Sequence, residues 1–182
     1  MRARRVAMRN YVRRIALKAG QLVQRVRLRG VPRLLYVTGP FVIGNGLRVV
    51  DTVSGVKITA DVRDYPSCMM IYGRYAPEVV TILKFLINLG DSVVDVGAHL
   101  GYITSNMATM VGPAGAVHSL EPDPQALMQV EMTIKANDHH WVRVFGLAAG
   151  DREGELRFTP LRHSAGLRRW HGPTTRTCRR SV

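Results

Sequence analysis

The sequence has few cysteines and no long apolar run. Cys68 and Cys178 lie far apart and form no CxxC or CxxH spacing. This argues against a zinc site or a disulfide framework and is typical of a reducing compartment. No stretch approaches about 20 uninterrupted apolar residues, so no transmembrane helix is predicted, and the N-terminus lacks the apolar core of a secretory signal. We therefore expect a cytoplasmic protein.

Acidic residues are missing from both ends of the chain. Residues 1–50 contain 12 Lys and Arg and residues 161–182 contain six, and neither range contains an acid. The net charge of +13 therefore comes from the ends, because residues 51–160 hold 8 basic and 13 acidic side chains. A nucleic-acid enzyme is expected to place positive charge on the folded surface around its cleft. We therefore expect no specific nucleic-acid partner.

The basic N-terminus, residues 1–33, is predicted to be an amphipathic helical extension. Apolar residues recur every three or four positions over residues 11–28, which indicates one apolar helix face. Gly20 weakens this helix by roughly 1 kcal/mol relative to alanine. Three interpretations stay open: a helix packed on the domain, a basic helix at an anionic membrane surface, or a targeting segment, which the absence of serine from residues 1–30 disfavours.

Residues 34–71 are predicted to be a small β lead-in. Short β-branched runs at Leu34–Thr38, Leu47–Val50 and Val56–Ala60 are separated by glycine-containing turns. A helix is predicted at Pro77–Leu89, with Gly90 ending it.

From Asp91 onward, predicted strands and helices alternate. The strands are Ser92–Val96, Ala116–Leu120 and Val142–Leu147, with a further short one at Glu155–Phe158, and the helices are Tyr102–Val111 and Pro124–Ala136. Such alternation implies right-handed crossovers and a parallel sheet. The sequence therefore predicts an α/β, Rossmann-like domain with flanking helices over residues 72–160.

A glycine turn, Asp95–Gly101, follows the first of these strands and precedes a helix. Gly97 permits the sharp turn, and Gly101 lets the start of the helix pack tightly. Free amides at the helix N-terminus suit an anionic group or a carboxylate. A dinucleotide fingerprint reads GxGxxG, whereas this turn has His99 between its two glycines. A pyrophosphate cradle is therefore less favoured than a site for a nucleoside that carries an amino acid.

Two carboxylates bracket this turn. Glu121 stands at the end of the second strand, where an acid can accept hydrogen bonds from both ribose hydroxyls. Asp95 ends the first strand and can reach a ligand ammonium directly or through water. Ammonium, sulfonium and ribose occur together in S-adenosylmethionine, the predicted cofactor. In the alternative interpretation, Asp95 only caps the next helix and Glu121 is a solvated strand end.

Residues 72–158 resemble the FkbM-type S-adenosylmethionine-dependent methyltransferases. The likeness is carried by YGRYAPE, by VVDVGAHLGYITSNMA and by SLEPDPQAL, and ends in GDREGELRF. It implies a class I methyltransferase fold, with the methionine end of the cofactor at Asp95, Gly97, Ala98 and Gly101. It also implies that Glu121 holds the ribose and that the segment around Ala148 lies near the adenine. The family more often has asparagine where this chain has His99.

The resemblance also implies an activity, the O-methylation of a small metabolite, sugar or glycan. The family pattern continues into further strands, whereas residues 161–182 read as a basic, disordered tail. We therefore expect a fold that is incomplete at its C-terminus through truncation or frameshift, with an open sheet edge that favours self-association. A genuine specialised tail is the alternative. Alternatives are an inactive remnant that at most binds cofactor, and a basic protein that associates with membranes or nucleic acid.

Several other polar residues have simple structural interpretations. Tyr72, Tyr75 and Glu78 either wall the cofactor pocket or pack. His139 and His140 lack a third ligand and are expected to be a loop pair rather than a metal site. Cys68 is expected to be a buried small side chain. The sequence identifies no general base.

Overall fold

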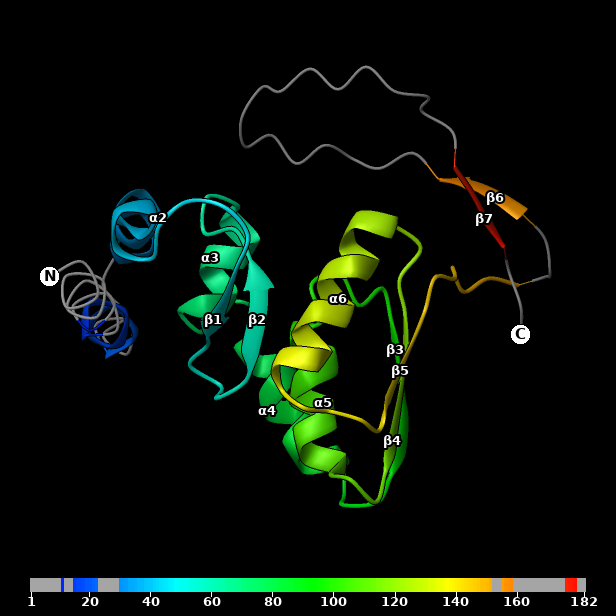
Figure 1. Ribbon diagram of the computed structural model, residues 1–182. Coiled ribbons are helices and arrows are strands. Elements are labelled where there is room, and N and C mark those ends of the chain that lie inside the picture. The colour runs from blue at the N-terminus through cyan, green and yellow to red at the C-terminus, as the bar shows by residue number, and fades with distance from the viewer. Residues whose placement is uncertain (1–10, 12–14, 23–29, 152–154, 159–175, 180–182) are drawn as a thin grey trace, which may run out of the picture.

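The computed structural model describes residues 11, 15–22, 30–151, 155–158 and 176–179, and arranges residues 30–145 in three layers (Figure 1). A parallel sheet forms one outer layer. Helices α5 (Tyr102–Val111) and α6 (Pro124–Ala136) form the middle layer, and the strand pair with helices α2 and α3 forms the other outer layer.

The sheet consists of β3 (Ser92–Val96), β4 (Ala116–Leu120) and β5 (Val142–Phe145). Their order is β3-β4-β5 and both pairings are parallel, with Ser92 opposite Ala116 and Val117 opposite Val142. The predicted α/β fold is thus confirmed, and the three strands and the two helices between them lie where the periodicity placed them, except that β5 ends at Phe145. Parallel pairing brings the carboxyl ends of all three strands to the same edge.

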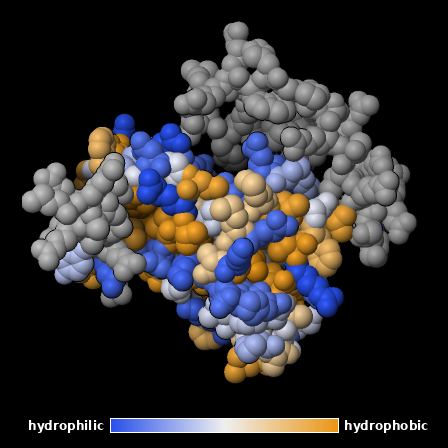
Figure 2. All heavy atoms as spheres, viewed as in Figure 1, coloured by the Kyte–Doolittle hydropathy of each residue, from blue (hydrophilic) through white to orange (hydrophobic). Residues whose placement is uncertain are grey.

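One face of this sheet is open in the described part of the chain. Helices α5 and α6 lie against one face of the sheet (Figure 1), where Val93 packs against the cluster around Met107 and Asp95 bonds to Thr104. Val94 and Val96, which alternate with them along β3, are 60% and 62% exposed. Strand β3 pairs with β4 alone among the described residues. Hydrophobic residues also reach the surface in Figure 2, interspersed with hydrophilic ones. The described sheet thus has an unpaired edge at β3 and an uncovered apolar face.

The strand predicted at Leu34–Thr38 is wrong, because these residues belong to helix α2 (Val31–Val42). Leu35 and Gly39, four residues apart, are the buried positions of α2, and Thr38 Oγ1 donates to the Leu34 carbonyl at 2.8 Å. Packing of one helix face therefore overrides the β-branched composition of the segment.

Helix α3 (Tyr65–Ile71) was not predicted, because every residue from Ser67 to Ile71 is buried and no polar face marks the helix period. Its start is nevertheless well signalled: Asp64 accepts from the Ser67 N–H at 3.0 Å, and a proline lies in the first turn. The predicted helix before the sheet is α4 (Pro77–Leu86), which ends earlier than expected because Ile87 is already extended.

Strands β1 (Arg48–Asp51) and β2 (Lys57–Ala60) form the predicted antiparallel pair. The other edge of β2 is covered by α6. The Asn137 side chain accepts from the Lys57 N–H at 2.8 Å and donates to the Lys57 carbonyl at 2.7 Å, while Thr133 Oγ1 accepts from the Thr59 N–H. These bonds satisfy backbone groups that an edge strand would leave unpaired, and they fix the lead-in against α6, which packs on the start of α5 at Gly101.

The described part of the N-terminal extension, residues 15–22, is a helix packed on the domain. Gln21 Nε2 donates to the carbonyls of Asp51 and Ile71 at 3.2 and 3.1 Å. Gly20 is buried, and a Cβ there would stand 2.8 Å from the Tyr72 ring. Within this range the structure favours the packed helix over a helix at a membrane surface. None of the helices in the described residues could span a membrane.

Gly20→Ala is expected to destabilise the protein by about 1 kcal/mol. The added methyl group must displace Tyr72 or Leu35, and overpacking of this kind costs about 1–3 kcal/mol, which exceeds the gain of about 1 kcal/mol in helix propensity. Urea unfolding measures the difference. In the control, Ala19→Gly at an exposed position of the same helix, only propensity is lost. A Gly20→Ala variant more stable than wild type would contradict this packing.

The sequence predicts a disordered tail over residues 161–182. Within this range, Arg176–Arg179 instead form strand β7, which pairs antiparallel with β6 (Glu155–Phe158). Composition does not indicate pairing between segments so distant in sequence. The rest of the predicted tail lies outside the described residues.

Candidate cofactor site

The glycine turn joins β3 to α5 at the carboxyl edge of the sheet. Gly97 and Gly101 have φ angles of 84° and 77°, which glycine adopts readily. The N–H groups of Gly97 and Ala98 both donate to the Leu120 carbonyl, at 2.9 and 3.1 Å, and Ala98 is buried. The turn is therefore fixed to the end of β4, the neighbouring strand.

Gly101 is required for a second reason. A Cβ at this position would stand 3.3 Å from Thr133 Cγ2 and 3.4 Å from the Val130 backbone, both on α6. The predicted tight packing at the start of α5 is therefore present, and it holds the two helices behind the turn.

Glu121 follows the last residue of β4 and its carboxylate reaches back to the turn. Its Oε2 accepts from the His99 N–H at 2.7 Å, and its Oε1 accepts from the Asp123 N–H at 2.9 Å. The side chain is only 7% exposed, so it is not the solvated strand end of the alternative interpretation. An ionised carboxylate has about four acceptor positions, so two bonds leave capacity for ligand hydroxyls.

Asp95 lies under the first turn of α5, where its Oδ2 accepts from the Thr104 hydroxyl at 2.5 Å. Burial raises the pKa of Asp95, the hydroxyl and backbone N–H of Thr104 lower it, and the nearby charge of Glu121 raises it again. Asp95 and Glu121 therefore lie within electrostatic reach of each other. The capping interpretation also holds in part, because Gly101 gives α5 no side-chain cap and Asp95 bonds to its first turn.

Ala148, the predicted adenine neighbour, is half-buried and lies three residues beyond β5. It follows the third strand as Gly97 and Glu121 follow the first two, so topology places it at the same edge of the sheet. Asp95, Gly97, Ala98, Gly101 and Glu121 are connected by hydrogen bonds and strand pairing at this edge, whereas Ala148 is placed there by topology alone.

Other polar residues have structural roles. Tyr72 is buried in the core against Gly20, and Tyr75 packs edge-on against the buried Tyr102. Burial raises the pKa of the Cys68 thiol to about 12, as expected of an unreactive buried side chain. Glu78 lies exposed in the first turn of α4.

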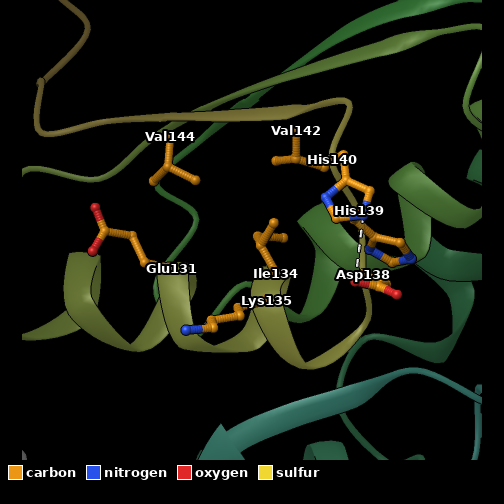
Figure 3. Close-up of a pocket in the computed structure, with 8 residues that line it drawn as sticks. All are labelled: Glu131, Ile134, Lys135, Asp138, His139, His140, Val142 and Val144. Carbon is orange, nitrogen blue, oxygen red and sulfur yellow. Dashed lines mark ion pairs between the residues drawn. The ribbon is translucent and has the colours of Figure 1, made fainter.

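A separate groove of about 370 Å³ runs between α6 and β5 (Figure 3). Ile134, Val142 and Val144 form its apolar wall, and no residue of the glycine turn lines it. His140 forms an exposed ion pair with Asp138 at 3.4 Å, while the His139 ring packs against Trp141. No group of metal ligands occurs among the described residues.

His99 has a φ angle of 54°, in the left-handed region that residues other than glycine seldom adopt, although asparagine, aspartate and histidine occur there more often than other side chains. Sequence reasoning noted the asparagine of related proteins without its cause, and the backbone angle supplies one. His99→Asn is expected to stabilise the protein by about 0.5–1 kcal/mol, measured by urea unfolding. His140→Asn, at an exposed position without a positive φ, should change stability by less than about 0.5 kcal/mol. Equal effects of both substitutions would argue against strain at His99.

Comparisons with known proteins find a matching family model and several remotely similar solved structures. A family model described as protein-L-isoaspartate(D-aspartate) O-methyltransferase matches residues 69–161. No curated protein matches. Similar solved structures include a SAM-dependent methyltransferase from Aquifex aeolicus, with 23% identity over 43% of this chain and 40% of that chain and a TM-score of 0.36.

Two further solved structures have comparable similarity. One is the M. jannaschii tRNA m1G37 methyltransferase, with 20% identity, 55% and 28% coverage and a TM-score of 0.42. The other is Aeropyrum pernix fibrillarin with bound S-adenosyl-L-methionine, with 20% identity, 38% and 31% coverage and a TM-score of 0.32. The chain thus spans between 28% and 40% of the length of these three structures.

The matched family is named for a methyltransferase, the class of protein that the sequence predicts. It does not identify the FkbM type or the acceptor. The matched segment begins in α3 and contains the glycine turn, Asp95 and Glu121. Because it comprises just over half of the 182 residues, the chain belongs to the protein-L-isoaspartate(D-aspartate) O-methyltransferase family.

Proposed function

We propose that this chain binds S-adenosylmethionine at the carboxyl edge of β3, β4 and β5. Asp95 accepts from the ligand ammonium and Glu121 from the ribose hydroxyls. Gly97, Ala98 and Gly101 surround the methionine end, and Ala148 lies beside the adenine.

The observation that carries this proposal is the buried carboxylate of Glu121, bonded to the His99 amide of the glycine turn and acting electrostatically on Asp95. Two carboxylates within electrostatic reach in a partly desolvated site favour a cationic ligand, because a cation between them offsets their repulsion. S-adenosylmethionine offers two positive groups and two ribose hydroxyls, which matches the acceptors present.

We further propose that the reaction is methyl transfer to an oxygen. When bound, S-adenosylmethionine supplies an electrophilic methyl group on its sulfonium. The chain's part is to hold that ligand in a fixed orientation, so that an acceptor oxygen meets the methyl in line with sulfur. The described residues assign no general base.

For the acceptor, we propose a hydroxyl or carboxyl oxygen of a small metabolite, sugar or glycan, in keeping with the FkbM resemblance. The name of the matched family, which refers to a carboxyl group of a protein, supports oxygen as the accepting atom. A cytoplasmic location and the absence of a specific nucleic-acid partner stay predictions of the sequence.

Methyl-labelled S-adenosylmethionine tests the reaction. Monosaccharides, carboxylic acids, glycans, an isoaspartyl peptide and transfer RNA are offered as acceptors in parallel. The proposal predicts label on an oxygen, released by mild alkali if the product is a methyl ester and retained if it is an ether. Label on RNA alone, or on nitrogen or carbon, would contradict the proposed acceptor.

A second candidate function is cofactor binding without turnover. Two observations on the described residues favour this function: Val94 and Val96 are exposed, and the edge of β3 is unpaired. A site that transfers a methyl group must be enclosed, because it has to exclude water on the side where the acceptor binds. Measured cofactor affinity without transfer to any acceptor would select this function. The same edge supports the expected self-association, and a membrane role for the basic N-terminus stays a prediction.

A further inference from the structure

The Thr104 hydroxyl lies between two polar groups of the parallel sheet. Its Oγ1 donates to Asp95 Oδ2 at 2.5 Å and lies 3.3 Å from Ser119 Oγ. Thr104 and Ser119 are both 0% exposed. A hydroxyl has one proton to donate, so the Thr104 proton goes to Asp95 and Ser119 is the donor in the second contact. The result is a directed chain of hydrogen bonds from Ser119 through Thr104 to Asp95.

Three elements of the fold fix this chain of bonds. Asp95 on β3 and Ser119 on β4 are direct partners in the strand register. Thr104 is the third residue of α5, after the N-cap Gly101, so the glycine turn determines where its hydroxyl lies. Because Thr104 and Ser119 are fully buried and each bond runs between different elements, the Asp95 carboxylate has little freedom to rotate.

We propose that Thr104 is a positioning residue for the cofactor: its hydroxyl holds Oδ2 of Asp95 and leaves Oδ1 for the ammonium of S-adenosylmethionine. This inference rests on the proposed function and deepens it. The sequence alone does not indicate this role of Thr104, since a hydroxyl inside a helix has no distinguishing pattern.

The proposal can be measured through the pKa of Asp95, because the groups around Asp95 shift it in known directions. Burial raises the pKa of Asp95, and the Thr104 hydroxyl is the largest of the influences that lower it. The other ionisable groups on the elements around it are Glu121, His99 in the turn, His118 on β4 and Tyr102 on α5, whose pKa is raised by burial. Loss of the hydroxyl therefore raises the pKa of Asp95 further, so ammonium binding should fail at a higher pH.

The test is calorimetric titration of S-adenosylmethionine at a series of pH values from acidic to neutral. Thr104→Val, which keeps the shape and removes the donor, is expected to shift the pH at which binding is lost upward by about one unit. It should also weaken affinity at neutral pH about tenfold. Thr104→Ser should restore the wild-type profile. An unchanged pH profile in Thr104→Val would overturn the proposal.

Two further variants keep the test decisive. Ser119→Ala removes the partner of Thr104 but not the donor to Asp95, so its shift should be smaller than that of Thr104→Val. If Thr104→Val fails to fold, Thr104→Cys carries a weaker donor and should shift the profile in the same direction. A wild-type profile in Thr104→Cys would then overturn the proposal.

The Asp95→Asn variant distinguishes failure of the positioning role of Thr104 from failure of the proposed role of Asp95 in the cofactor site. If Asp95→Asn loses affinity while Thr104→Val binds like wild type, the positioning role is wrong and the proposed cofactor site stands. If Asp95→Asn binds like wild type, the proposed role of Asp95 fails, and the positioning role fails with it.

Discussion

Glu121→Ala is expected to reduce the affinity for S-adenosylmethionine by about 100-fold or more. Hydrogen bonds to a charged group contribute about 1.5–3 kcal/mol each, and the substitution removes both ribose acceptors at once. It also leaves the N–H groups of His99 and Asp123 without their acceptor. Protein stability should therefore fall by about 2 kcal/mol, and calorimetry and urea unfolding measure the two effects.

Two comparisons make this prediction specific. Glu121→Gln keeps the volume but turns an NH₂ group toward one of the two N–H donors, so it should lose affinity nearly as far as alanine does. Glu131→Ala, an exposed carboxylate on α6 that lines the separate groove, should leave cofactor affinity unchanged. Wild-type affinity in both Glu121 variants would remove Glu121 from the site.

Asp95→Asn is expected to weaken S-adenosylmethionine binding about 10- to 100-fold at neutral pH, because it removes the negative charge that faces the ammonium. The asparagine carbonyl can still accept from the Thr104 hydroxyl. Packing should therefore survive, so that the change in affinity reports the charge. Calorimetry of the folded variant measures it, and equal affinity of Asp95→Asn and wild type would contradict the assignment.

The pH dependence of stability and of cofactor binding in the wild-type protein provides a second test of the role of Asp95. Because burial raises the folded-state pKa of Asp95 above its ordinary value, the folded state holds the proton more tightly than the unfolded state. The contribution of Asp95 to the stability of the unliganded chain therefore rises as pH falls through the folded pKa. Cofactor binding should fade in the same pH range, because it needs the ionised form. Both trends should vanish in Asp95→Asn.

The part of the fold that carries the site was predictable because its signals are local and repeated. Each strand from β3 to β5 is a short apolar run, and the helices α5 and α6 have their boundaries at turn residues. The predicted limits of β3 and α5 match the structure, since the glycine turn separates them. Parallel pairing then brings Asp95 and Glu121 to one edge without further information.

Outside this part of the fold, tertiary packing decided what local pattern could not. Helix α2 has a β-branched composition and is helical because Leu35 and Gly39 pack on the core. Helix α3 is buried all round and so shows no helical period. In the site, the residue type of Thr104 does not indicate that its hydroxyl is buried and bonded to Asp95. The residue type of His99 likewise does not indicate a positive φ angle. Both depend on contacts between elements that are distant in sequence.

The most direct test of the cofactor site is an amide ¹H–¹⁵N NMR titration of the wild-type chain with S-adenosylmethionine. The account predicts that the amides of Gly97, His99, Gly101 and Ala148 shift together and follow one binding curve. Glu131 and Lys135 in the groove between α6 and β5 should stay unchanged. Shifts confined to that groove, or none at saturating ligand, would contradict a methyl-donor site at the glycine turn.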